Sequence, residues 1–234
     1  MGFLIQQVLL AFLYLNTRTI IDFYYLSCMT DKAYLKQLRV PTKDNPLRVL
    51  VSACLTGIMF GVNGDSNGEY PSVLKLLKYD TLKIVTFCPE DFSFGTPREM
   101  CDIYGGIGFD VLNGKAKVLT SSGIDWTDGM IKASEKMLEI AQKNKIELAV
   151  MMDISAACGS QVIYDGNRYA EEKKYQIGMG VCGAQLTRAG FKVISQRDFA
   201  SLEMLYSKVD GTHTIDTKAK DHNEGDWYKE YFKK

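Results

Sequence analysis

Short apolar runs alternate along the chain with segments whose apolar residues have helical spacing. Apolar runs of strand length occupy residues 48–53, 82–87 and 146–152, and residues 191–195 form a last one. The first is rich in β-branched residues and alternates only weakly, which is typical of a strand covered on both faces. Because strand and helix patterns alternate, the sequence predicts an α/β fold with a parallel sheet and right-handed crossovers.

Several helices are expected between these strands. Residues 72–79 and 127–144 repeat apolar positions at helical spacing. Residues 180–189 predict a helix that ends at Gly190, and 31–38 a short one. The segment 96–99 (TPRE) has the composition of a helix start, with Thr as the cap and Pro at the first helical position. We therefore expect a helix there whose buried face includes Met100, Ile103 and Tyr104.

Shorter elements and the two ends complete the predicted architecture. Residues 116–121 predict an additional strand, in an edge hairpin with 109–112, and 162–164 a brief one. The predicted organisation is an N-terminal extension (1–46), a single Rossmann-like three-layer domain with a mainly parallel sheet (47–197) and a C-terminal helix and tail (198–234). Within that tail, Trp227 and Tyr231 are spaced to share a helix face that docks on the domain.

The first 28 residues do not resemble the rest of the chain. The apolar stretch 3–15 is too short to span a bilayer, and no positively charged region precedes it as in a secretory signal. We expect residues 1–28 to be a mis-assigned start, an expression remnant or an added amphipathic helix.

The composition is typical of a globular protein, and its charge balance favours a small ligand. Hydrophobic residues make up 46% and charged residues 24% of the chain, and 28 basic residues balance 28 acidic ones. This balance argues against a nucleic-acid or membrane partner and favours a small-molecule substrate. A monomer or homodimer is expected.

Three cysteines occur where predicted strands end. Cys54, Cys88 and Cys158 lie in the sequences SAC, CPE and SAACG. The carboxyl ends of parallel strands meet at the edge of the sheet where open α/β sheets bind ligands. We therefore expect the three thiols to converge on one point.

The number of cysteines and the positions of the histidines limit which kinds of cysteine site are expected. Six cysteines placed at strand ends and in helices do not form a disulfide scaffold, so a reducing cytoplasm is expected. The two histidines, His213 and His222, both fall in the polar tail. This position argues against a cysteine nucleophile paired with a core histidine and against a mixed Cys/His zinc site.

Three thiolates without a histidine suit an iron-sulfur cluster, or less well a zinc ion with a further ligand. A cubane held by three protein sulfurs leaves one iron open as a Lewis acid. The alternative is that the three cysteines are small hydrophobic core residues. Spacing alone does not decide between these interpretations.

Nine motifs along residues 48–195 resemble those of the thiouracil desulfurase family. In order they are VSACLTG, a loop ending in VNG, FCPE, GTPRE, GIDWT, SAACG, IYDG, GMGV and FKVIS. The resemblance implies a 4Fe-4S cluster on Cys54, Cys88 and Cys158, with the fourth iron open to the sulfur of a thiolated base. It also implies catalytic roles for Glu90 and Ser155.

By the same resemblance, Asn63 of VNG and Asp165 of IYDG are expected to bind substrate. The chain departs from the family pattern in having SAACG for SPSCG, VNG for YDG and Gln196 for Glu. The predicted function is cluster-dependent removal of sulfur from a thiolated nucleobase or related small thioamide, giving the oxo compound and sulfide. A non-catalytic iron-sulfur or sulfur-carrier module remains an alternative.

A glycine motif supports a third, weaker alternative. Residues 178–183 match G-x-G-x-x-G, and Asp198 follows the first glycine at the spacing of a dinucleotide site. The preceding segment 171–177 is charged, whereas such a site requires an apolar strand. We therefore interpret the glycines as close packing, with Cys182 as a core residue on the following helix and Cys101 beside the buried face of the predicted 96–104 helix.

Overall fold

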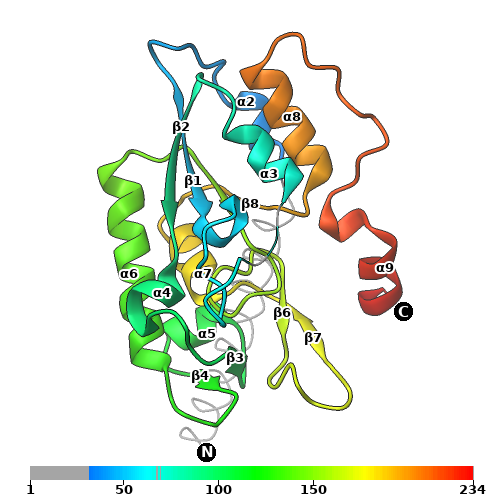
Figure 1. The fold of residues 1–234 in the computed structure, drawn as a ribbon. Coiled ribbons are helices and arrows are strands. Elements are labelled where there is room, and N and C mark those ends of the chain that lie inside the picture. Colours follow the sequence, from blue (N-terminus) through cyan, green and yellow to red (C-terminus); the bar gives the residue numbers. More distant parts are fainter. Residues whose placement is uncertain (1–31, 67, 69, 234) are drawn as a thin grey trace, which may run out of the picture. The chain divides into compact units, whose positions relative to one another are not determined.

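A four-stranded parallel sheet forms the centre of the compact unit Ala33–Lys234. The computed structural model describes residues 32–66, 68 and 70–233, so the expectations for residues 1–28 lie outside the described residues. The sheet has the order β2-β1-β5-β8 (Figure 1), and the predicted α/β fold is confirmed. Its strands are β1 (Leu47–Ser52), β2 (Leu82–Phe87), β5 (Leu148–Met151) and β8 (Val193–Ser195).

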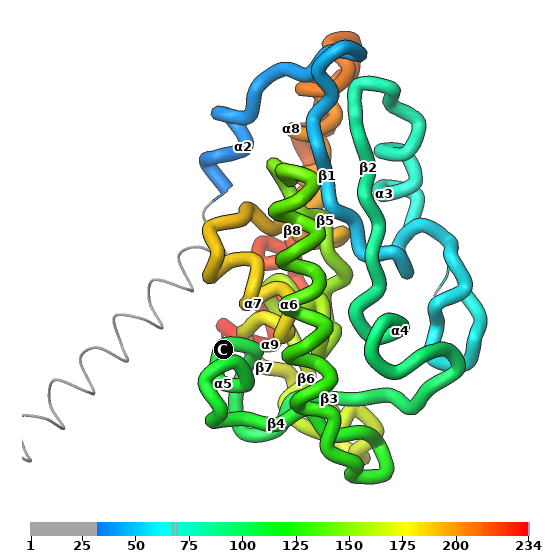
Figure 2. The backbone as a smooth tube through the Cα atoms, turned by 90° about the vertical axis from the view of Figure 1, so that its left-hand side faces the viewer, coloured from blue at the N-terminus to red at the C-terminus, as the bar shows by residue number. Residues whose placement is uncertain are grey.

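Helices cover both faces of this sheet. Leu50 packs on one side with α6 (Thr127–Lys143) and α7 (Val181–Arg188). Val49 and Val51 point the other way, because side chains alternate along a strand. In Figure 2, α6 lies in front of the sheet and α8 behind it. The helices on this second side are α2 (Tyr34–Gln37), α3 (Pro71–Leu76) and α8 (Phe199–Val209).

The segment TPRE does not start a helix, so this prediction is wrong. Helix α4 (Pro89–Phe94) instead begins directly after β2, with Pro89 in its first turn. Thr96 Oγ1 donates to Asp91 Oδ1 at 2.6 Å instead of capping the residues that follow it. The chain then enters β3 (Cys101–Tyr104), so tertiary contacts override the local start pattern.

The predicted partner of the strand at 116–121 is also wrong. The strand itself is present as β4 (Lys117–Thr120), but it pairs antiparallel with β3. Residues 109–112 belong to the helix α5 (Gly108–Leu112), because Asp110 Oδ2 accepts the Ile107 N–H at 3.0 Å and fixes a helical first turn. A further hairpin joins β6 (Val162–Tyr164) to β7 (Tyr175–Ile177), the second of which lies in the charged segment.

The C-terminal tail docks on the domain, as predicted. It contains a 3-10 turn, η2 (His222–Glu224), and α9 (Asp226–Phe232). The Tyr231 hydroxyl accepts the N–H of Tyr175 at 2.9 Å, and the Trp227 ring lies edge-on to the Tyr175 ring. His222 is buried within this docked tail. The sequence around His222 is polar, as expected, but the His222 side chain itself is buried.

Among the residues that the structure describes, none of the helices combines the length and apolar character needed to cross a bilayer.

Candidate active site

Three cysteines from three separate strand ends line one cavity of about 180 Å³. Cys54 lies in the 3-10 turn η1 (Ala53–Thr56) that follows β1. Cys88 joins β2 to α4, and Cys158 lies in the loop after β5. Because these strands are adjacent and parallel, their carboxyl ends bring the three thiols to the same edge of the sheet. The predicted convergence is therefore present in the structure.

Cys88 and Cys158 are buried, and Cys54 is half-buried. The Cys54 Sγ lies 3.4 Å from the Met152 Sδ, and the Cys88 Sγ accepts the Asp91 N–H at 3.4 Å. Burial raises the pKa of Cys88, and it raises that of Cys158 further, helped by the nearby Cys182, Cys54 and Cys88. Burial thus disfavours the free thiolates, and bound iron would stabilise them.

The donor set at this cavity is of a type that an iron-sulfur cluster can use. No three His, Cys, Asp or Glu side chains within the described part of the chain are arranged around one metal ion. In a cubane each protein sulfur bonds a different iron, so its ligands lie farther apart than the ligands of one ion. The cavity offers three thiols and no histidine, which is the soft type of donor that iron-sulfur clusters use.

Glu90 and Ser155 meet beside these thiols. Glu90 lies in the first turn of α4, and its Oε2 accepts from Arg98 Nη2 at 3.0 Å and from Arg98 Nε at 3.3 Å. The Ser155 Oγ lies 3.5 Å from Glu90 Oε1 and accepts the Cys158 N–H at 3.1 Å. The carboxylate is therefore anchored through one oxygen, while the other faces Ser155 at the cavity.

The two predicted substrate-binding residues lie elsewhere. Asn63 and Asp165 are exposed, and neither lines the cysteine cavity. Val62, next to Asn63, and Arg168, three residues after Asp165, do line it. The roles of Asn63 and Asp165 stay predictions.

Two arginines of the cavity were missed by sequence reasoning. Arg98 belongs to TPRE, where the helix-start pattern concealed that its side chain is only 4% exposed. Arg168 forms a fork with Asp102, with Nη2 to Oδ1 at 2.6 Å and Nε to Oδ2 at 3.0 Å. Its guanidinium also lies over the Tyr164 ring. No local pattern marked Arg168, because its partner is 66 residues away.

The glycine motif brings α7 close to the loop that carries Ser155 and Cys158. A Cβ added at Gly180 would lie 2.6 Å from both Ser155 O and Ala157 O. The preceding strand β7 belongs to an antiparallel hairpin outside the parallel sheet, unlike the strand of a dinucleotide site. The interpretation as close packing is therefore supported, although the partner is a loop. Cys182 is fully buried, as predicted, and Cys101 is buried in β3 instead of a helix.

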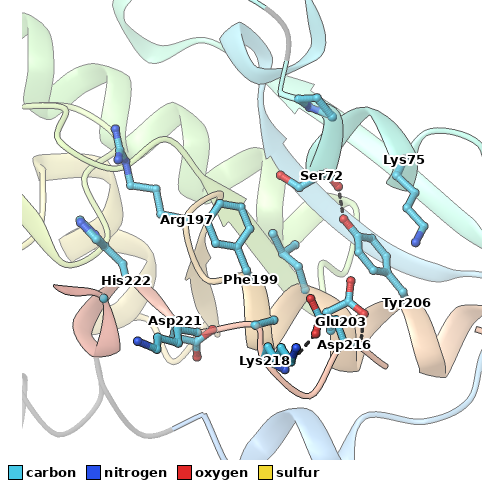
Figure 3. A pocket seen from close by; sticks show the side chains of 15 residues that line it. Ser72, Lys75, Arg197, Phe199, Glu203, Tyr206, Asp216, Lys218, Asp221 and His222 are labelled. Atoms are coloured by element: carbon cyan, nitrogen blue, oxygen red, sulfur yellow. Dashed lines mark hydrogen bonds between the residues drawn. The ribbon is translucent and has the colours of Figure 1, made fainter. Parts of the chain in front are cut away.

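A second, larger cavity of about 680 Å³ lies between α3, α8 and the tail, and no cysteine lines it (Figure 3). Charged side chains of both signs surround it. Glu203 is paired with His213 at 2.8 Å, and Lys220 with Asp226 at 3.1 Å. This cavity therefore offers no thiol ligand for an iron-sulfur cluster.

Comparison with known proteins gives the family. Residues 49–198 match the sequence model of the 2-thiouracil desulfurase family. The chain belongs to the 2-thiouracil desulfurase family. The matched stretch begins within β1, ends after β8 and includes all three cysteines of the cavity. The resemblance inferred from the ordered motifs is confirmed.

Two proteins similar to this chain show how much of it is shared. The uncharacterized protein YbbK of Bacillus subtilis (strain 168) is 40% identical over 151 residues, which is 64% of this chain and 96% of YbbK. A solved structure of the [4Fe-4S]-dependent thiouracil desulfidase TudS is 29% identical with a TM-score of 0.56, covering 69% of this chain and 98% of TudS. The predicted fold and the prediction of a desulfurase agree with both the family and this structure.

Proposed function

We propose that this chain is a [4Fe-4S]-dependent desulfidase that replaces the sulfur of a thiolated nucleobase, or a related small thioamide, with oxygen. The observation that carries the proposal is the meeting of three thiols with Glu90 and Ser155 at one cavity. The family and the TudS likeness support it.

Cys54, Cys88 and Cys158 are the residues that would hold the cluster. Their side chains come from three strand ends and share a buried cavity, which excludes competing water from a thiolate-bound centre. When bound, the cluster supplies an iron without a protein thiolate, a Lewis acid that draws electron density from a C=S bond through its sulfur.

Glu90 is the proposed general base. Arg98 fixes its Oε2, so Oε1 is directed toward Ser155 and the cavity, where it can accept a proton from water. The water oxygen bonds the C=S carbon, the C–S bond breaks, and sulfur leaves as sulfide. One water and one thioamide give one oxo compound and one hydrogen sulfide, so no electrons are gained or lost overall.

The cavity walls suit a planar heterocycle. Phe87, Met100, Met152 and Ile154 supply apolar surface, and Ser155 supplies a hydroxyl at one side. Mostly apolar walls with a few placed polar groups are the usual composition of small-molecule sites. A thiolated pyrimidine base is therefore the substrate that we would assay first.

Glu90→Gln tests the base assignment. We expect sulfide release from 2-thiouracil by the anaerobically reconstituted protein to fall roughly 100- to 10,000-fold, because general-base catalysis is lost. Iron content should stay unchanged, since Glu90 is not a proposed ligand. Glu99→Gln is the matched control, because Glu99 bonds Ser121 and Ser122 away from the cavity. An unchanged rate for Glu90→Gln would refute the assignment, and an iron-loaded wild type that releases no sulfide would favour the non-catalytic alternative.

A further inference from the structure

A histidine of the C-terminal tail reaches the loop that carries Cys158. His222 is 8% exposed, and its Nδ1 lies 2.6 Å from Asp153 Oδ2. Its backbone N–H donates to Asp198 Oδ1 at 3.1 Å. The family match ends at residue 198, so this histidine belongs to a part of the chain outside the matched stretch.

Asp153 ties together both ends of the cysteine loop, residues 153–162. It is 2% exposed, and its Oδ1 accepts three backbone N–H groups, those of Ser160 and Gln161 at 3.0 Å and of Val162 at 3.1 Å. Its own N–H donates to Gln196 Oε1 at 2.7 Å. The cysteine loop carries Ser155 and Cys158, so one carboxylate fixes the segment that presents two cavity residues.

Asp198 reinforces the same arrangement. Its carboxylate accepts both from Gln161 Nε2, at 2.7 and 2.8 Å, and from the Ser195 N–H at 2.7 Å. His222 thus contacts two buried carboxylates, one with its ring and one with its backbone. Buried carboxylates are costly without hydrogen-bond donors, and His222 supplies one donor to each of these two.

Aromatic residues of α9 hold the His222 ring in place. The Trp227 ring stacks on it with centroids 5.5 Å apart, and the Tyr228 ring lies edge-on at 5.8 Å. The Trp227 ring also contacts Tyr175 of the β7 strand. The tail therefore delivers a fixed donor to Asp153.

We propose that His222 is a positioning residue for the cysteine loop. Hydrogen-bonded to Asp153, it holds the loop in the form that presents Cys158 and Ser155 to the cavity, and so lengthens the retention of the cluster. The consequence for the cluster rests on the proposed function, whereas the consequence for the loop does not.

The other tail histidine provides a matched control. His213 pairs with Glu203 at 2.8 Å and lies 3.3 Å from Lys75 Nζ. Glu203 and Lys75 line the larger cavity, as does His222 itself. None of the hydrogen bonds of His213 in the described part of the chain reaches the cysteine loop. Both histidines are thus tail residues hydrogen-bonded to a carboxylate, but only the carboxylate that His222 contacts belongs to the cysteine loop.

The experiment compares His222→Ala, His222→Asn, His222→Gln and His213→Ala in the full chain. Two readouts are the half-life of the reconstituted cluster's absorbance under an iron chelator and the amide hydrogen exchange of residues 158–162 in cluster-free protein. The Asn side chain can place its amide N–H near the position of Nδ1, whereas Gln places it near that of Nε2.

We expect His222→Ala and His222→Gln to shorten the half-life at least tenfold and to speed exchange at residues 160–162 by a similar factor. His222→Asn should stay within threefold of wild type, and His213→Ala within twofold. If His222→Ala does not fold, the comparison of His222→Asn with His222→Gln tests the proposal. Equal behaviour of these two, or an unchanged loop exchange in His222→Gln, would overturn the proposal. A wild type that binds no iron would refute the proposed function, and the exchange comparison would still test the role of His222.

Discussion

Two segments flank the family-matching stretch and are fixed to it in different ways. Before it, Arg39 forms a fork on Glu147, with Nε to Oε1 at 2.7 Å and Nη2 to Oε2 at 2.9 Å. These side chains are 30% and 21% exposed. After it, His222 bonds Asp153, whose side chain is fully buried. The first contact lies just before β5 begins, and the second lies just after β5 ends, beside the cysteine loop.

Because the two contacts differ in burial and position, their loss should have different effects on stability and on the site. A partly exposed ion pair typically contributes about 0.2–1 kcal/mol to folding, because water already solvates both charges well. Removing one partner of a buried pair costs roughly 3–5 kcal/mol, because the other charge is left without compensation. The tail contact should therefore affect both folding and the site, whereas the Arg39 contact should affect folding slightly.

Asp153→Ala should have the largest effect. The substitution leaves three backbone N–H groups and His222 without their shared acceptor, so we expect a loss of roughly 3–5 kcal/mol in the free energy of unfolding. For a domain of this size, that is a fall on the order of 10 °C in Tm. Urea and thermal unfolding of the cluster-free protein measure the loss. A change below about 1 kcal/mol would show that the buried contact is no stronger than the exposed one.

The stabilisation that the Asp153 carboxylate provides should depend on pH. Burial acts to raise the pKa of Asp153, but the hydrogen bond from His222 and the backbone N–H groups outweigh it, so the pKa is lowered. The contribution of Asp153 to the free energy of unfolding is therefore complete above the pKa of an aspartate in the unfolded chain, about 4. It is lost as the pH falls through the lower pKa that Asp153 has in the folded protein. His222 and Asp198 are the titratable groups next to it. The stability difference between wild type and Asp153→Ala should narrow as the pH falls below about 4.

Arg39→Gln should have a smaller effect, about 1 kcal/mol, with no change in cluster half-life. Lys43→Gln is its control in the same segment, because Lys43 and Asp80 form a pair that is 74% and 64% exposed. Water screens that pair, so we expect no resolvable change in Tm. An Arg39→Gln variant that lost its cluster as fast as His222→Ala would abolish the distinction between the two segments.

The parts of the site that sequence predicts are those fixed by local pattern and sheet topology. Near-continuous apolar runs marked β1 and β2 to within a residue, and the rule for parallel strands brought Cys54, Cys88 and Cys158 together. The contacts that were missed depend on distant partners. His222 sits among polar neighbours, and nothing near it indicates an acceptor 69 residues upstream. TPRE satisfied the composition of a helix start, but Arg98 contacts Glu90 instead.

The most direct test of the central claim is iron and labile sulfide analysis of five single Cys→Ala variants after anaerobic reconstitution. Cys101 and Cys182 are the controls, because both are buried thiols that do not line the cavity. We predict that the Cys54, Cys88 and Cys158 variants lose most of their iron and sulfide, while the Cys101 and Cys182 variants keep the wild-type amounts. Full iron in any of the first three, or a wild type containing zinc or no metal, would contradict the account.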